Sequence, residues 1–337
     1  MLRGRFGGNL SICTAINRFA TGATVKAVHV FCDCCSSSES KDIATKRGYK
    51  LRQCGNCGLI FVCPLPEPEH LAKLYRKTAG YFTTANTDLS ETSQSYAINM
   101  SKVLSNNGIE AGRLLDVGCS TGAFIYHMRR LKWQVTGVEV NPDAVAVARQ
   151  NHLDVVRGKL ENCSFDEGSF DVIHMGDVIE HLSSPRETLR AAHRLLRKGG
   201  LIVIRTINAK CGFAVSSLLF AKIFRFPWPH SEAPYHLYDF YPKTLSRLLS
   251  GVGFEMVSLN CFGYTPFLYT VGATGFFDDL KSAMKKTGKY RFCLQLLKDI
   301  PKLALVAAIL FPFYIWGTIS DRLQGTGARI LLIGRRR

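Results

Sequence analysis

The chain has 337 residues, 47% of them hydrophobic, and a formal net charge of +17. Its length accommodates one full α/β domain with small additions, and its apolar fraction is ordinary for a globular protein. Most of the charge lies at the ends, because residues 1–30 contribute +4 and residues 281–337 contribute +10. A basic groove across the nearly neutral core is therefore not required, and nucleic acid is not a favoured partner.

Residues 1–28 form a basic N-terminal extension that carries four basic side chains among Ser and Thr. Organellar transit peptides have a similar composition, but we favour a flexible extension or a misplaced start codon. No signal-peptide pattern opens the chain, and most of the twelve cysteines are scattered. Both features are typical of a reduced protein, so we expect a cytoplasmic location.

Residues 29–63 are predicted to form a zinc-ribbon module. Two C-x-x-C pairs are separated by eighteen residues, and each pair can present two thiolates from one tight turn. The four predicted zinc ligands are Cys32, Cys35, Cys54 and Cys57. A closed four-sulfur site has no open coordination position, so we assign it no catalysis. Cys34 is an alternative to Cys32 or Cys35, and a module that keeps its thiols without metal is the other interpretation.

Residues 64–109 are expected to form a linker and lid helices. The proline-rich run 64–68 predicts an extended linker, and residues 70–77 predict a short helix. Residues 78–95 are polar and rich in Thr and Ser, which indicates a surface loop or part of a lid.

From residue 110 onward, strand and helix patterns alternate, as in a doubly wound α/β sheet. Strands are predicted at 114–117, 135–140, 155–156, 170–173 and 201–204, and helices at 124–131, 143–150 and 185–196. Two later strands, near 254–259 and 328–334, bring the predicted Rossmann-like sheet to seven strands. The domain is expected to span 110–337, with an apolar insertion at about 263–326.

The sequence L-L-D-V-G-C-S-T-G-A-F at 114–124 joins the first of these strands to its helix through two glycines. Glycine lets the backbone approach a ligand closely, and ligands of such sheets lie beyond the carboxyl ends of the strands. Glu139 ends the next strand, where a carboxylate can accept hydrogen bonds from both hydroxyls of a ribose. A dinucleotide-binding enzyme would use the same geometry, but the G-x-G-x-x-G fingerprint is absent. Asp116 would also be badly placed beside a pyrophosphate.

These motifs resemble those of class I S-adenosylmethionine-dependent methyltransferases. The run at 115–122 resembles their first motif and V-E-V-N-P at 138–142 their second. F-D-V-I-H-M-G-D-V-I-E-H-L at 170–182 resembles their fourth, in the form found in the ubiquinone-biosynthesis O-methyltransferase group. The turn at 195–200 and the aromatic segment at 235–240 extend the resemblance over about 110–262, and the zinc-ribbon front also recurs in that group.

The resemblance implies that the last strand of the sheet is antiparallel and lies beside the fifth. It also implies S-adenosylmethionine as the cofactor and assigns its contacts position by position. Asp116, Gly118 and Gly122 would hold the methionine end, and Glu139 the ribose. Leu160 and Glu161 would border the adenine, and Met175 and Gly176 would line the wall beneath the sulfonium. Lys159 departs from the pattern, because many relatives have an acid there.

His181, just after the fourth strand, is the candidate general base, since methylation of a hydroxyl needs a proton acceptor. Its structural alternative is a histidine that hydrogen-bonds Glu180 or the backbone. His236, on the aromatic segment, is a weaker candidate base. The acceptor is expected to be a small molecule, a glycan or a lipid-linked compound, and the family favours methylation at oxygen.

Two other functions compete with this interpretation. A zinc module with basic tails also suits an RNA methyltransferase, although the amino-methylating N/D-P-P-Y/F signature is missing. A catalytically inactive scaffold would bind through its ribbon or its apolar tail, but intact Asp116 and Glu139 argue against it.

Residues 303–320 form an uncharged run of eighteen residues, which is marginal for a transmembrane span. Predicted strands precede and follow this run in one sheet, so a single crossing is excluded if they form. Pro312 would also break or kink a helix there. The run is either core or an interfacial segment, and the basic residues on both sides favour the latter. We therefore expect peripheral association with an anionic surface, the inner face of the membrane.

Overall fold

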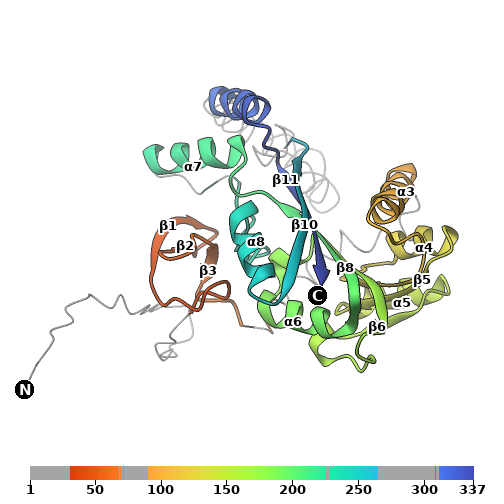
Figure 1. Ribbon diagram of the computed structural model, residues 1–337. Helices are drawn as coiled ribbons and strands as arrows, with labels where there is room; N and C mark the ends of the chain where they lie inside the picture. Colours follow the sequence, from red (N-terminus) through yellow and green to blue (C-terminus); the bar gives the residue numbers. More distant parts are fainter. Residues whose placement is uncertain are drawn as a thin grey trace, which may run out of the picture.

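The computed structural model describes residues 31–67, 90–224, 230–264 and 311–337, with a few single positions between them. Predictions for the extension 1–28, the helix at 70–77 and most of the segment 78–95 lie outside the described residues. The same holds for most of the insertion at 263–326. The described residues form one seven-stranded and one four-stranded sheet, with helices packed against them (Figure 1).

The seven-stranded sheet has the order β10-β11-β8-β7-β4-β5-β6. Its strands are β4 (Arg113–Val117), β5 (Gln134–Glu139), β6 (Val155–Arg157), β7 (Phe170–Gly176), β8 (Leu196–Ile207), β10 (Phe254–Phe262) and β11 (Arg329–Arg336). β4 pairs in parallel with both β5 and β7, which makes its carboxyl end the switch point where such sheets bind ligands. β11 is antiparallel to both β8 and β10. The predicted doubly wound, seven-stranded fold and its antiparallel last strand are confirmed.

Central strands read as apolar runs because helices cover both faces of the sheet. The helices are α3 (Glu91–Asn106), α4 (Ala123–Arg130), α5 (Pro142–Gln150), α6 (Pro185–Leu195) and α8 (Pro242–Ser250). Helices α3 and α4 share one core with Leu114, Val172 and Val203 of the sheet. The other core joins α6 and α8 to side chains of the opposite face, such as Leu115 and Ile204.

Two predicted boundaries are wrong. The fifth strand was expected at 201–204, but β8 begins at Leu196 because it pairs with β7 from its first residue, with a register irregularity before Leu201. The segment 78–95 was expected to be a loop or lid, but its last residues already belong to α3. The Ser90 side chain caps this helix by accepting from the amide of Ser93.

The four-stranded sheet has the order β1-β2-β3-β9 and lies beside the larger one (Figure 1). Its strands are β1 (Ser40–Lys46), β2 (Tyr49–Cys54), β3 (Ile60–Cys63) and β9 (Tyr238–Asp239). β9 comes from the aromatic segment that precedes α8, and it pairs with β3 through Phe61 and Ile60. The predicted front module is thus completed by a strand from the second half of the chain.

Two further helical segments lie next to each other at one end of the molecule (Figure 1). One is α7 (Gly212–Phe224), which the sequence analysis did not predict, and the other is helical over 311–324. Gly212 and Gly317 allow close backbone contact, since a Cβ on Gly212 would lie 2.0 Å from the Gly317 carbonyl oxygen. Among the described residues, no helix combines the length and hydropathy needed to cross a membrane.

Candidate functional site

The turn after β4 is built around two glycines in the left-handed region of backbone space. Gly118 has φ 71° and Gly122 has φ 89°, values that L side chains rarely adopt. A Cβ on Gly118 would lie 2.5 Å from Val178, and one on Gly122 would lie 2.3 Å from Leu153. The Gly118 amide donates to the Val138 carbonyl at 2.7 Å, which fixes the turn against β5. The two predicted glycines therefore shape the edge of the switch point.

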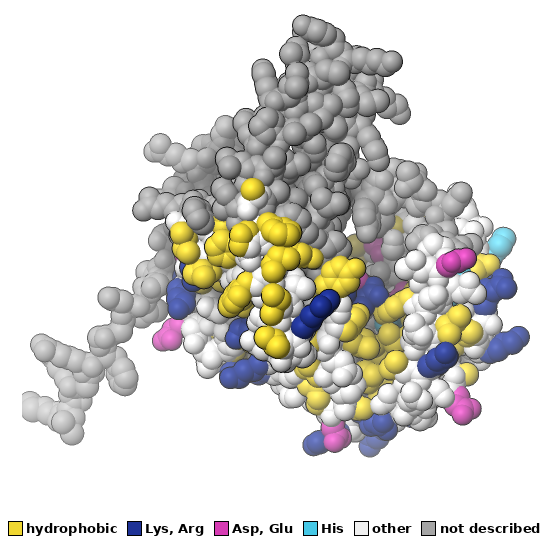
Figure 2. Space-filling model, turned by 90° about the horizontal axis from the view of Figure 1, so that it is seen from above, with side chains coloured by type: hydrophobic (Ala, Val, Ile, Leu, Met, Phe, Trp, Pro, Cys, Tyr) yellow, Lys and Arg dark blue, Asp and Glu magenta, His cyan; other side chains and the backbone are white. Residues whose placement is uncertain are grey.

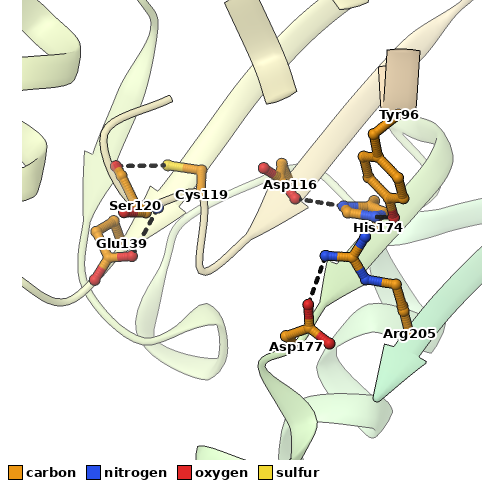
Figure 3. A network of polar contacts seen from close by, with 8 residues as sticks. All are labelled: Tyr96, Asp116, Cys119, Ser120, Glu139, His174, Asp177 and Arg205. Atoms are coloured by element: carbon orange, nitrogen blue, oxygen red, sulfur yellow. Dashed lines mark hydrogen bonds and ion pairs between the residues drawn. The ribbon is translucent and has the colours of Figure 1, made fainter. Parts of the chain in front are cut away.

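Glu139 ends β5 and faces this turn (Figure 3). Its Oε2 accepts from the Ser120 amide at 3.0 Å, and its Oε1 accepts from the Asn141 amide at 2.8 Å. Burial raises the pKa of Glu139, while these two amide hydrogen bonds oppose the shift. One carboxylate oxygen is thus held by the loop after β4 and the other by the loop after β5. Each oxygen can still accept a hydrogen bond from a hydroxyl group.

Asp116 lies in a buried chain of polar groups that the sequence analysis did not foresee (Figure 3). Its Oδ1 lies 2.6 Å from Nδ1 of His174, and the other ring nitrogen of His174 lies 2.8 Å from the Tyr96 hydroxyl. Asp116 and His174 are only 4% and 3% exposed. They are register partners on β4 and β7, so parallel pairing itself brings them together. The pairing of strands was the signal that could have identified His174.

A charged group continues this chain toward the carboxyl ends of β7 and β8. Arg205 lies over the ring of Tyr96, with its guanidinium carbon 4.2 Å from the ring centroid. The carboxylate of Asp177 accepts from Arg205 at 2.5 Å and from Arg329 at 2.6 Å. Burial raises the pKa of Tyr96, so the phenol stays protonated. This arrangement anchors α3 across the edge of the sheet where the predicted methionine contacts lie.

The predicted adenine contacts lie beyond β6, in η1 (Leu160–Asn162). Leu160 is 2% exposed, and the carboxylate of Glu161 accepts from the Thr188 hydroxyl at 3.2 Å. Glu161 is therefore bonded to α6 within the protein. Lys159, the residue that departs from the family pattern, donates to the Ser183 hydroxyl at 3.4 Å.

Met175 and Gly176 end β7, beside the switch point. Met175 is fully buried, and a Cβ on Gly176 would lie 2.7 Å from the His174 ring. Glycine at 176 is therefore needed for the His174 ring to occupy its place. The two predicted wall residues lie next to the Asp116 network in the sheet.

The two candidate bases meet in space, although 55 residues separate them in the sequence. His181 lies in η2 (Ile179–His181), and its ring centroid is 4.7 Å from that of His236. Metal-ligating atoms of Glu180, His181 and His236 all lie within 4.8 Å of one another. Both histidines were predicted from the sequence as candidate bases, but their contact was not.

Nδ1 of His181 lies 2.8 Å from the Tyr235 carbonyl oxygen. A carbonyl can only accept, so Nδ1 carries the proton, and Nε2 is the basic nitrogen of the neutral ring. Burial lowers the pKa of His181, and burial together with His181 lowers that of His236. Burial raises the pKa of Glu180 to about 8. The cluster can thus hold neutral imidazoles at neutral pH.

The four cysteines predicted to bind zinc lie together at one end of the small sheet. Sγ of Cys32 is 3.5 Å from that of Cys57, and the same distance separates Cys35 from Cys54. Four sulfurs about 2.3 Å from one zinc ion lie roughly 3.8 Å apart, so the donor set fits a tetrahedral metal. Cys34 instead directs its sulfur to the Thr244 carbonyl at 3.5 Å.

Comparisons with known proteins show which family the chain belongs to. The family profile described as "Methyltransferase domain" matches residues 87–259, just over half of the chain. The ubiquinone biosynthesis O-methyltransferase of Glaesserella parasuis is 34% identical over 113 residues, which are 30% of this chain and 48% of that protein. Its counterpart in Xanthomonas euvesicatoria is 28% identical over 167 residues, 47% of this chain and 69% of that protein. The chain thus spans about half the length of the first relative and just over two thirds of the second.

Among solved structures, an S-adenosylmethionine-dependent methyltransferase from Archaeoglobus fulgidus superposes with a TM-score of 0.46 at 16% identity. The superposition covers 77% of this chain and 99% of that one.

Proposed function

The chain belongs to the class I S-adenosylmethionine-dependent methyltransferases, and we propose that it methylates an oxygen of a small, glycan or lipid-linked acceptor. The relatives named above are O-methyltransferases. The observation that carries the proposal is the half-buried pair of His181 and His236, with Nδ1 of His181 fixed on a carbonyl. A hydroxyl acceptor needs such a proton acceptor, whereas an amine or a thiolate does not need it to the same degree.

The cofactor supplies a methyl group on a cationic sulfur, so the protein's main task is positioning. In-line alignment of the reacting groups is worth roughly 7–11 kcal/mol. Glu139 would hold the ribose hydroxyls, because both its oxygens already have fixed directions. Asp116 would accept from the amino group of the methionine moiety, since His174 restrains its carboxylate. The glycines would let the backbone approach the ligand closely.

His181 would take the proton from the acceptor hydroxyl at Nε2 as the oxygen attacks the methyl carbon. Its Nδ1 would donate to the Tyr235 carbonyl throughout, which stabilises the imidazolium that forms. Burial raises the pKa of Glu180 to about 8, so at lower pH its carboxyl group would be protonated and would add no negative charge beside the histidines. General-base catalysis of this kind is worth about 10²–10⁴-fold in rate.

We also propose that the four-cysteine group holds one structural zinc ion. The sulfur positions support this, and so do the amides of Cys57 and Leu59, which donate to sulfurs of the group at 3.5 Å. All four ligand positions would be filled by thiolates, so zinc would contribute folding energy rather than chemistry.

The proposed function can be tested by screening labelled S-adenosylmethionine against polar lipid and glycan extracts. We expect a labelled product whose methyl is bound to oxygen. His181→Ala should lower kcat by about 10²–10⁴-fold with little change in cofactor affinity. His193→Ala, in α6, is the matched control and should keep full activity. Full activity of the His181 variant would refute its role as base, and methylation at nitrogen or carbon would refute the acceptor class.

A further inference from the structure

α7 and the helical residues 311–324 carry apolar side chains on their exposed sides as well as on their buried sides, where α7 places Phe213 and Phe220. In α7, Ser216 and Ser217 are fully buried, while Val215, Leu219 and Ile223 are 47%, 50% and 59% exposed. The buried hydroxyls donate to carbonyls of their own helix, and the Trp228 indole nitrogen lies 3.2 Å from the Ser217 oxygen. A helix at a water-facing surface normally directs its apolar side chains inward. The exposed stripe of α7 is therefore not explained by packing against the described residues.

The second helix repeats this pattern. Its inner side packs on α7, where Tyr314 contacts Phe213 and Phe313 contacts Phe220 through their rings. Its outer side is apolar over four turns and consists of Phe311, Ile315, Trp316, Ile319 and Leu323, which are 40–82% exposed. We call the exposed apolar residues of both helices the two-helix face. Seen from above in Figure 2, hydrophobic side chains gather over this end of the molecule.

The exposed charged side chains of the two helices are basic. Lys222 and Arg322 are exposed. The single acidic residue, Asp321, is turned inward, where its carboxylate accepts from the Gly212 amide at 2.7 Å and from the Thr326 hydroxyl at 2.5 Å. The sequence just before the second helix, residues 281–302, carries seven Lys and Arg against one Asp. An apolar face bordered by cations is complementary to an anionic lipid surface.

From this combination we propose that the two-helix face docks on an anionic bilayer. Apolar side chains would enter the headgroup and acyl boundary, and the cations would meet lipid phosphates. A second copy of the chain is a poorer occupant, because a two-fold interface would bring the same basic side chains together.

The face also lies at the edge of the sheet that carries the catalytic residues. α7 follows the carboxyl end of β8, and the second helix leads into the amino end of β11, which is antiparallel to β8. Gly118, Glu139 and Gly176 lie at the carboxyl ends of strands parallel to β8. Docking would therefore bring the active-site edge close to lipid. On the condition that the proposed function holds, this favours the lipid-linked class among the acceptors.

The test is flotation of the full chain with vesicles of phosphatidylcholine and phosphatidylglycerol in equal parts, and with phosphatidylcholine alone. We expect the protein to float with the mixed vesicles at low salt and to stay at the bottom with neutral ones. The variant Leu219→Ser/Trp316→Ser/Ile319→Ser should lose about tenfold or more of its vesicle affinity. The matched control is Phe31→Ser, which removes a 60% exposed aromatic side chain outside the face and should float like the wild type.

Calorimetry with S-adenosylmethionine shows whether the triple variant is folded. If the triple variant is not folded, the double variant Lys222→Gln/Arg322→Gln is tested instead. It should float only at a lower salt concentration than the wild type needs. Failure of the wild type to float would overturn the proposal, as would equal flotation of the folded variant. Self-association that the triple variant abolishes, without vesicle binding, would assign the face to a second copy instead. None of these results bears on methyl transfer to a soluble acceptor, so the proposed function is tested separately.

Discussion

Glu139→Ala removes the carboxylate that ends β5, and its effect on cofactor binding can be estimated from the contacts of this side chain. Both oxygens are fixed by backbone amides, at 3.0 Å and 2.8 Å, so the carboxylate meets a ribose without reorganising. Losing a charge-assisted bidentate contact costs about 2–4 kcal/mol. Since 1.4 kcal/mol is a tenfold change, we expect the Kd for S-adenosylmethionine to rise by about 30- to 1000-fold.

The same substitution also leaves the amides of Ser120 and Asn141 without their acceptor. A buried donor that loses its partner costs about 1–3 kcal/mol, so the free energy of unfolding should also fall. The two effects separate in practice: calorimetry on protein that is still folded gives the Kd, and denaturant unfolding without cofactor gives the stability. Glu255→Ala is the matched control, because Glu255 lies on β10, at the far edge of the sheet from β5, where its carboxylate accepts from Arg337, and it should change the Kd much less.

An unchanged Kd in folded Glu139→Ala would show that the cofactor does not bind at the carboxyl end of β5. A Kd that rises equally in both glutamate variants would indicate a general loosening of the domain. Either result would refute the assignment of this carboxylate to the ribose.

Three further predictions concern other parts of the molecule. His174→Phe should lower the free energy of unfolding by about 1–3 kcal/mol and weaken cofactor binding, because buried Asp116 loses its partner; Tyr96→Phe should have a smaller effect in both assays. Metal analysis should find about one zinc per chain in wild type and in Cys34→Ser but a clear loss in Cys54→Ser, and equal loss in both variants would contradict the ligand set. Burial favours the protonated form of Glu180 and raises the pKa of this carboxyl from 4.5 to about 8. The stabilisation that the folded protein gains from this proton is therefore complete below pH 4.5 and is lost as the pH rises through about 8. Thermal unfolding of Glu180→Gln should therefore depend less on pH than that of wild type across this range, and parallel curves would show that this carboxyl does not titrate as inferred.

Several parts of the fold that depend only on residues close together in the sequence were predicted correctly. The apolar runs of β4 and β5 and the glycine turn after Val117 are local patterns, and the structure has strands and a turn at these places. The seven strands were predicted from their sequence patterns, and the antiparallel last strand through family resemblance. The extent of β8 was not, because its first residues are in the strand only through their pairing with β7.

Features that depend on distant pairing were missed. The contact between Asp116 and His174 follows from register across β4 and β7, and no local pattern marks it. β9 is only two residues long, so neither alternation nor length could identify it, and it forms because β3 offers an edge. α7 was missed because it is apolar on its buried and its exposed side, so no amphipathic periodicity marks it in the sequence.

The pairing of β9 with β3 gives the small sheet a structural part in the proposed acceptor site. The Val62 amide donates to the Leu237 carbonyl at 2.9 Å, and the Leu237 amide donates to the Glu180 carbonyl at 2.8 Å. One backbone segment therefore connects β3 to the loop that carries His181.

The same segment presents the His236 ring and supplies the Tyr235 carbonyl that sets the tautomer of His181. The Tyr241 hydroxyl donates to the Cys57 carbonyl at 3.0 Å, and Arg186 of α6 donates to the Asp33 carbonyl at 2.7 Å. A metal ion bound by the cysteines as proposed would thus also restrain Tyr241, which directly follows the aromatic segment 235–240, and the start of α6. The proposed metal site, without chemistry of its own, would in this way help to orient the proposed general base.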